Sequence, residues 1–125
     1  MPSRPAQGCT LVAEPAAGAG ARYRLAGVAG FKTAKALLAQ GSAEFAGRPR
    51  VEVDLTGLES ADSAGLAVLL TWVERAHRAG QALRFTGLPA QLGGIARVCG
   101  VEALLRAAEA PEGAPEAPRS AELRR

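Results

Sequence analysis

Few side chains in this sequence could take part in chemistry, and they are spread along the chain. The only histidine is His77, the two cysteines are Cys9 and Cys99, and Ser63 directly follows Asp62. A serine, a histidine and a carboxylate form a nucleophilic set when hydrogen bonds can join them. Ser63 and His77 fall within one predicted helix, where their separation along the sequence corresponds to about 21 Å at about 1.5 Å per residue. This distance excludes a histidine-activated Ser63, and we expect no enzymatic activity.

The residue types also argue against a metal or nucleotide site. A metal site needs several histidine, cysteine or carboxylate ligands brought together, and a single histidine offers little toward such a set. The pair Gly93-Gly94 lacks the following Lys-Ser/Thr of a phosphate-binding loop. We therefore expect neither a metal nor another cofactor.

The composition indicates one small globular domain. The 125 residues carry a net charge of +3 and are 48% hydrophobic, which is enough for a modest core. Basic and aromatic residues do not alternate as a single-strand binder would require, so no nucleic-acid partner is predicted. The isolated Cys9 and Cys99 indicate reduced thiols. Without a signal peptide or an apolar run near the roughly 20 residues of a membrane span, the chain is predicted to be soluble and cytoplasmic.

A strand, a turn and a helix must position Ser63. Residues 50–55 alternate between apolar and polar side chains and predict a strand. The segment TGLES around Gly57 predicts a turn. A helix over residues 63–79 follows, ended by Gly80. Its predicted inner stripe contains Leu66, Leu69, Leu70, Val73 and His77.

The remaining pattern completes an α/β domain. Strands are predicted over residues 9–13, 21–25 and 83–86, with Gly27 and Gly30 ending the second of them. Helices are predicted over residues 33–45 and 91–98, and a helical turn is predicted over residues 101–108. In the helix over residues 91–98, the side chains of Leu92, Ile95 and Val98 are expected to be buried. This order implies a mixed sheet with helices packed on one face. Residues 1–8 and 109–125 are predicted to be disordered around a domain spanning 9–108.

The central segment resembles a known family. The run LESADSAGLAVLLTWVERAHRAGQALRFTGLP contains Asp-Ser-x-Gly-Leu at the start of an apolar helix, which is similar to the central motif of STAS domains. Over residues 51–105 it looks most like the MlaB-like type, a small subunit of bacterial phospholipid-transporting ABC complexes. Anti-sigma factor antagonists are related, but the segment LAGVAGF lacks the acid that often follows their second strand.

The resemblance implies a STAS-like α/β fold and a non-enzymatic role. An MlaB-like chain would bind and stabilise or regulate an MlaF-like ABC transporter ATPase subunit, and would reach the inner membrane only through that partner. The resemblance implies a contact formed by Asp62, Ser63, Ala64 and Gly65, with Trp72 and Arg75 beside it. The alternative is an anti-sigma factor antagonist that a kinase switches by phosphorylating Ser63.

Three of these residues admit more than one role. Ser63 is a helix-capping residue type, a partner contact, or a phosphorylation site at which added charge would block binding. Gly65 lets another backbone approach closely, either from a partner or from the domain's own loop. Trp72 flanks the predicted inner stripe, so it is either an exposed binding residue or a residue that seals the edge of the core.

Overall fold

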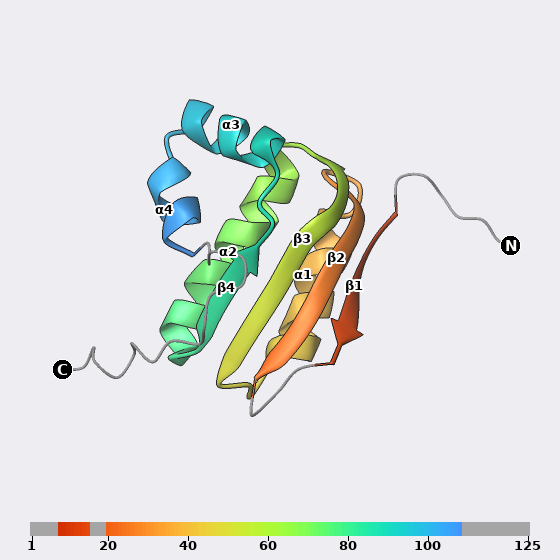
Figure 1. Cartoon of the computed structure of the whole chain (residues 1–125), viewed down its shortest axis with the longest axis vertical. Coiled ribbons are helices and arrows are strands. Elements are labelled where there is room, and N and C mark those ends of the chain that lie inside the picture. The colour runs from red at the N-terminus through yellow and green to blue at the C-terminus, as the bar shows by residue number, and fades with distance from the viewer. Residues whose placement is uncertain (1–7, 16–19, 109–125) are drawn as a thin grey trace, which may run out of the picture.

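The computed structural model describes residues 8–15 and 20–108. Within them, four strands form one sheet in the order β1-β2-β3-β4 (Figure 1). β1 runs antiparallel to β2, and the other neighbouring pairs are parallel. The strands are β1 (Cys9–Glu14), β2 (Ala21–Ala29), β3 (Arg50–Ala61) and β4 (Ala82–Thr86). The predicted disordered ends lie outside the described residues, except for Gly8.

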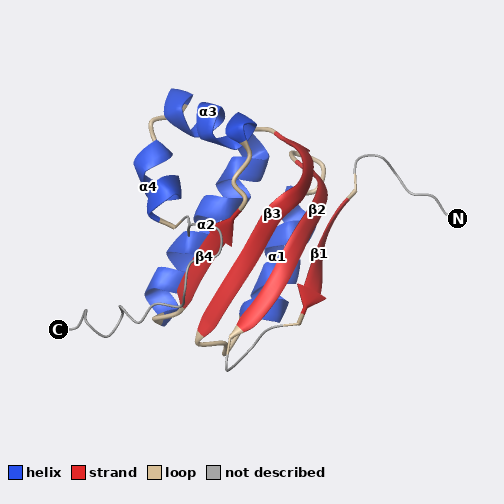
Figure 2. Cartoon of the chain, in the orientation of Figure 1, coloured by secondary structure: helices blue, strands red, loops and turns tan. Residues whose placement is uncertain are grey.

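Helices cover one face of this sheet, as the sequence predicted. The helices are α1 (Ala34–Phe45), α2 (Ser63–Ala79), α3 (Ala90–Val98) and α4 (Glu102–Ala107). α1 and α2 lie side by side behind the strands, while α3 packs on α2 near the end of β3 (Figure 2). α4 packs near α2 on the β4 side of the sheet (Figure 1). The result is a single α/β domain with a mixed sheet.

β2 and β3 are longer than predicted, because each supplies the other with a partner. β2 continues through Gly27 to Ala29, and β3 continues through the TGLES segment instead of turning there. The register shifts after Arg24 and again after Gly27, so β3 accommodates extra residues as bulges. A Cβ on Gly57 would lie 2.9 Å from the carbonyl oxygen of Leu25. Gly57 therefore permits close strand pairing and does not form the predicted turn.

The buried stripe of α2 is rotated relative to the prediction. Trp72 and Ala76 are buried, at 2% and 4% exposed, whereas His77 is exposed. The shift arises because α1 packs beside α2, and the added contact buries the flank that carries Trp72. In α3, Leu92 is buried as predicted, but Val98 is 88% exposed and Ala96 takes the buried position.

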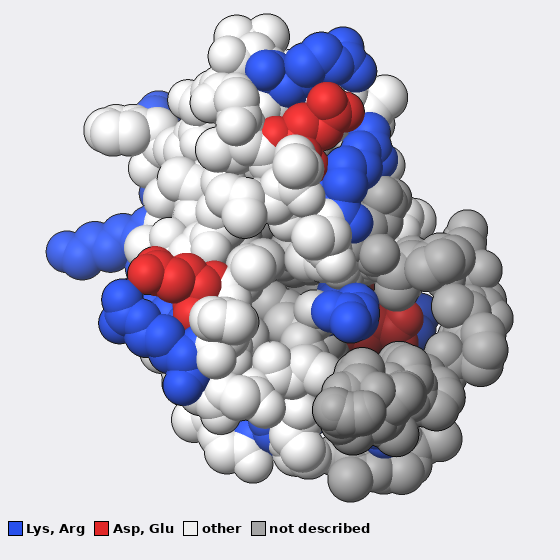
Figure 3. All heavy atoms as spheres, turned by 90° about the vertical axis from the view of Figure 1, so that its left-hand side faces the viewer, with Lys and Arg blue, Asp and Glu red and all other residues white. Residues whose placement is uncertain are grey.

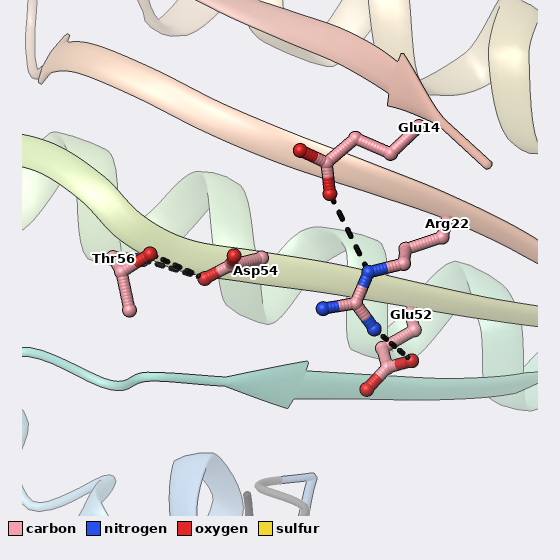
Figure 4. Close-up of polar contacts among 5 residues, drawn as sticks. All are labelled: Glu14, Arg22, Glu52, Asp54 and Thr56. Atoms are coloured by element: carbon pink, nitrogen blue, oxygen red, sulfur yellow. Dashed lines mark hydrogen bonds and ion pairs between the residues drawn. The ribbon is translucent and has the colours of Figure 1, made fainter. Parts of the chain in front are cut away.

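The sheet face opposite the helices is polar. Arg22 Nη1 donates to Glu52 Oε1 at 2.8 Å, and Arg22 Nε lies 3.4 Å from Glu14 Oε1 (Figure 4). The backbone N–H and the hydroxyl of Thr56 donate to Asp54 Oδ1 at 2.9 and 2.7 Å. Partial burial acts to raise the pKa of Asp54, but the two Thr56 hydrogen bonds and the nearby Arg22 charge outweigh it and lower that pKa. Internal pairs thus satisfy several charges of this face.

Candidate functional site

Asp62 begins helix α2 and caps it. Its Oδ1 accepts hydrogen bonds from the backbone N–H groups of Ala64, at 2.8 Å, and Gly65, at 3.1 Å. These are orphan donors of the first helical turn, which a capping side chain normally satisfies. The Gly65 bond, with those from Phe31 and Ala64, lowers the pKa of Asp62 despite the opposing effect of burial. Asp62 is therefore ionised at neutral pH.

Ser63 is the first residue of the helix and not its cap, so the capping interpretation of Ser63 is wrong. The N-cap position belongs to Asp62, whose backbone is extended. The Ser63 side chain is exposed, and in the described part of the chain its hydroxyl has no hydrogen-bond partner. A hydroxyl in this position remains accessible for a contact or a modification.

Gly65 serves the domain's own packing. A Cβ at this position would collide with the carbonyl oxygen of Ala29 at the end of β2. The backbone N–H of Asp62 also donates to that oxygen, at 3.2 Å. Gly65 is buried by this contact, so its predicted role as a direct partner contact is wrong. The residue instead allows β2 to lie close against the start of α2.

Phe31 belongs to this site, although no sequence pattern indicated it. Its side chain is 83% exposed, while its backbone N–H donates to Asp62 Oδ2 at 3.3 Å. The exposed Lys32 and Lys35 follow it and are the only lysines in the chain. The available signal was an aromatic residue in a short connection, outside any apolar periodicity. Asp62 thus joins an exposed aromatic residue to the segment that carries Ser63.

Trp72 and Arg75 do not join this surface. Trp72 is buried at 2% exposed and packs edge-to-face on Phe45 with ring centroids 5.2 Å apart. Its role as a core residue is confirmed, and its predicted role as a partner contact is wrong. Arg75 is exposed and donates to the Ser42 hydroxyl at 2.8 Å. It lies about 18 Å along the helix axis from Ser63 at about 1.5 Å per residue, too far to share a small contact.

The remaining reactive residue types do not gather at Ser63. His77 lies near the opposite end of the continuous helix α2. Cys9 and Cys99 are free thiols, and burial raises the pKa of Cys9 to about 11, which keeps it protonated at neutral pH. Among the described residues, no cluster of three or more histidine, cysteine or carboxylate side chains could hold a metal ion.

A shallow groove lies at the far end of α2, away from Ser63. It has a volume of about 440 Å³ and runs between α2, β4 and α4, where Val73, Leu83, Leu104 and Ala107 contribute apolar atoms. The face of the molecule that carries β4 and α4 is mostly uncharged (Figure 3). Over the described ranges, no helix combines the length and apolar character that crossing a membrane requires.

Solved structures of known proteins share this fold. An anti-sigma factor antagonist from Mycobacterium paratuberculosis superposes with a TM-score of 0.66 and 19% identity, covering 78% of this chain and 83% of its own. The anti-sigma factor antagonist SpoIIAA in its unphosphorylated form gives a TM-score of 0.62 and 14% identity, covering 92% and 96%. A sulfate transporter family protein from Wolinella succinogenes gives 0.62 and 18%, covering 84% and 86%.

A comparison of the sequence with curated proteins finds no match. The family model described as "Mlab, STAS domain" matches residues 12–106 and so spans most of the chain, including Asp62, Ser63 and Phe31. STAS domains are generally non-enzymatic domains that regulate or bind other proteins. Because this family model matches most of the chain, and because the chain shares the fold of its structural neighbours, the chain belongs to the STAS family, in its MlaB-like type.

Proposed function

We propose that this chain is a non-enzymatic subunit that binds and regulates the ATPase subunit of an Mla-type phospholipid-transporting ABC transporter. The family match, which is to the MlaB-like type of STAS domain, supports this choice. The ATPase subunit, MlaF-like in that type, would hold the chain at the cytoplasmic side of the inner membrane. The chain itself would supply a docking surface and no chemistry.

The observation that carries the proposal is the exposed surface around Asp62. Phe31 is 83% exposed at a place where the backbone is hydrogen-bonded to Asp62, and the exposed Ser63 follows on the helix. Large aromatic residues are enriched at protein interfaces, where burial of their apolar area favours binding. The exposed Lys32 beside Phe31 adds positive charge, which suits an acidic rim on the ATPase subunit. Ala64, which is half-buried in the first turn of α2, borders the same surface.

The exposed Ser63 hydroxyl also favours a second candidate function, that of an anti-sigma factor antagonist. A phosphate adds about −1.5 to −2 charge at neutral pH and would stand next to the Asp62 carboxylate. The added charge and bulk would oppose binding of a partner at this surface. In this alternative the partner is a kinase-like anti-sigma factor and Ser63 is its substrate.

An affinity capture from the native cell tests the two candidates. Tagged wild-type chain is compared with Ser63→Asp, and captured proteins and Ser63 phosphorylation are read by mass spectrometry. Ala43→Asp is the matched control, because it adds the same charge at an exposed position near the other end of α1. We expect wild type and Ala43→Asp to capture an ABC ATPase subunit, and Ser63→Asp to capture much less.

The other outcomes separate the proposals. A kinase-like anti-sigma factor in place of the ATPase subunit, together with phosphorylated Ser63, would support the alternative and reject the main proposal. Equal capture of the ATPase subunit by all three chains would support the proposed partner. It would also show that the partner does not bind at the surface around Ser63. Lys32 and Lys35 are the only lysines, so amine-reactive cross-linking of the complex, read at these two residues and at the terminal amine, then locates the contact. Strong cross-links from Lys32 are expected if the partner covers this surface, and their absence is expected if it binds elsewhere.

A further inference from the structure

The Asp62 carboxylate uses both of its oxygens, and each serves a different segment. Oδ1 accepts from the N–H groups of Ala64 and Gly65 in the first turn of α2. Oδ2 accepts from the N–H of Phe31, in the connection between β2 and α1. One side chain therefore joins two segments that are 31 residues apart in the sequence.

Gly30 lets the Asp62 carboxylate lie close to the connection between β2 and α1. A Cβ on Gly30 would lie 2.8 Å from Asp62 Oδ2, closer than such atoms approach in folded proteins. Thr33 holds the other side of the same connection, because its Oγ1 accepts from the Gly30 N–H at 2.9 Å and donates to the Val28 carbonyl at 2.9 Å. The Phe31 backbone is thus fixed between Thr33 and Asp62, and its side chain points away from the core.

We propose that Asp62 is a positioning residue, which holds the exposed Phe31 side chain at a fixed place relative to Ser63. The inference rests on the proposed function, because it assigns Phe31 and Ser63 to one partner contact. A partner then meets an apolar ring and a hydroxyl as one preorganised surface. Because the connection that carries Phe31 is already ordered, binding does not have to include the entropic cost of ordering it, and this raises the affinity.

The two oxygens of Asp62 allow the two functions to be separated. Asparagine is as good a helix cap as aspartate, so in Asp62→Asn the single oxygen can still accept from Ala64 and Gly65. The amide NH₂ then replaces Oδ2 and faces the Phe31 N–H as a second donor, which breaks that bond. Asp62→Ser is the second variant: it keeps a capping oxygen and removes the second acceptor without adding a donor there.

The first test uses the full chain alone and measures amide hydrogen exchange by NMR. In both variants we expect the Phe31 amide to exchange about fivefold faster or more, the loss expected for one hydrogen bond. Exchange at Ala64 and Gly65 should stay at the wild-type rate. Unchanged exchange at Phe31 would overturn the proposal. An equal acceleration at all three amides would also overturn it, because the start of α2 and the connection that carries Phe31 would then open together, and no separate role of Oδ2 would remain.

The second test is a double-mutant cycle with the ATPase subunit recovered by affinity capture. We expect Asp62→Asn to weaken binding about fivefold and to have no further effect in a Phe31→Ala background. Additive losses would overturn the positioning role, because Asp62 would then contact the partner by itself. If wild type does not bind an ATPase subunit, the proposed function fails, while the exchange measurement still decides whether Asp62 positions Phe31.

Discussion

At the scale of single residues, Gly41 determines how closely the two helices behind the sheet approach each other. It lies in the interior of α1 and is buried against the indole of Trp72. A Cβ at this position would collide with Trp72 Nε1. Glycine costs helix stability relative to alanine, but here it allows α2 to bury a large aromatic side chain against α1.

We predict that Gly41→Ala destabilises the domain by about 1–3 kcal/mol, the usual cost of forcing extra volume into a packed core. Gly94→Ala is the matched control, because Gly94 also lies in a helix but has open space where a Cβ would stand. It should stabilise by about 0.5–1 kcal/mol through helix propensity. Urea unfolding measures both, and equal effects of the same sign would contradict the packing argument.

Trp72 combines a favourable ring with an unfavourable polar atom. Its Nε1 is buried and has no hydrogen-bond partner in the described part of the chain, which costs about 1–3 kcal/mol. Trp72→Phe removes this N–H together with part of the ring. Because the two effects oppose each other, we expect stability to change by less than about 1.5 kcal/mol, whereas Trp72→Ala should lose about 3–5 kcal/mol. Thermal unfolding distinguishes these outcomes, and similar losses in both variants would show that the N–H carries no penalty.

At the scale of elements, the start of α2 depends on the charge of one side chain. Hydrogen bonds from Gly65, Phe31 and Ala64 lower the pKa of Asp62 in the folded state. The unfolded chain, with an aspartate pKa of about 3.9, therefore binds a proton more tightly than the folded chain does. The contribution of Asp62 to stability is complete above that unfolded pKa and is lost as the pH falls through the folded one.

We predict that acid destabilises the wild type more than it destabilises Asp62→Asn. Urea unfolding at intervals from pH 7 to pH 2.5 measures the difference in the free energy of unfolding, in which the contributions of other carboxylates largely cancel. The difference should be constant near neutral pH. Below about pH 4, the free energy of unfolding should fall more steeply for the wild type than for Asp62→Asn. Parallel curves over the whole range would contradict a lowered pKa for Asp62.

At the scale of the whole molecule, the structure provides partners at both edges of its sheet. At the β1 edge, the Gln40 side chain accepts from the Leu11 N–H at 3.3 Å and donates to the Leu11 carbonyl at 3.1 Å. At the β4 edge, the Phe85 N–H donates to the carbonyl of Ala108 at 2.9 Å. Unpaired edges invite strand addition from other chains. These contacts favour binding through the surface around Asp62 over strand pairing.

We predict that Gln40→Ala exposes the β1 edge, lowers stability by about 1 kcal/mol and increases self-association. Ser42→Ala is the control, because Ser42 lies on the same helix and its hydroxyl contacts Arg75 and not β1. Thermal unfolding and light scattering on a sizing column measure the two effects. Gln40→Ala chains with the mass and stability of the control would show that the Gln40 amide does not protect the edge.

The sequence by itself determined the parts of this protein that depend on neighbouring residues. The bounds of α2 and its end at Gly80 were both predicted and are present. So were the alternation along the first half of β3 and the mixed sheet with helices on one face. Caps, helix periodicity and strand alternation act over a few residues, so each can be inferred from a short segment.

Only the tertiary structure decided the rest, because it depends on residues far apart in the chain. Trp72 is buried because α1 lies beside α2 and Gly41 leaves space for the indole. β3 extends through the predicted turn because β2 pairs with it. Phe31 joins the candidate site because its N–H meets Asp62, 31 residues away. Periodicity predicts which residues share a face, but the neighbouring element determines whether that face is covered.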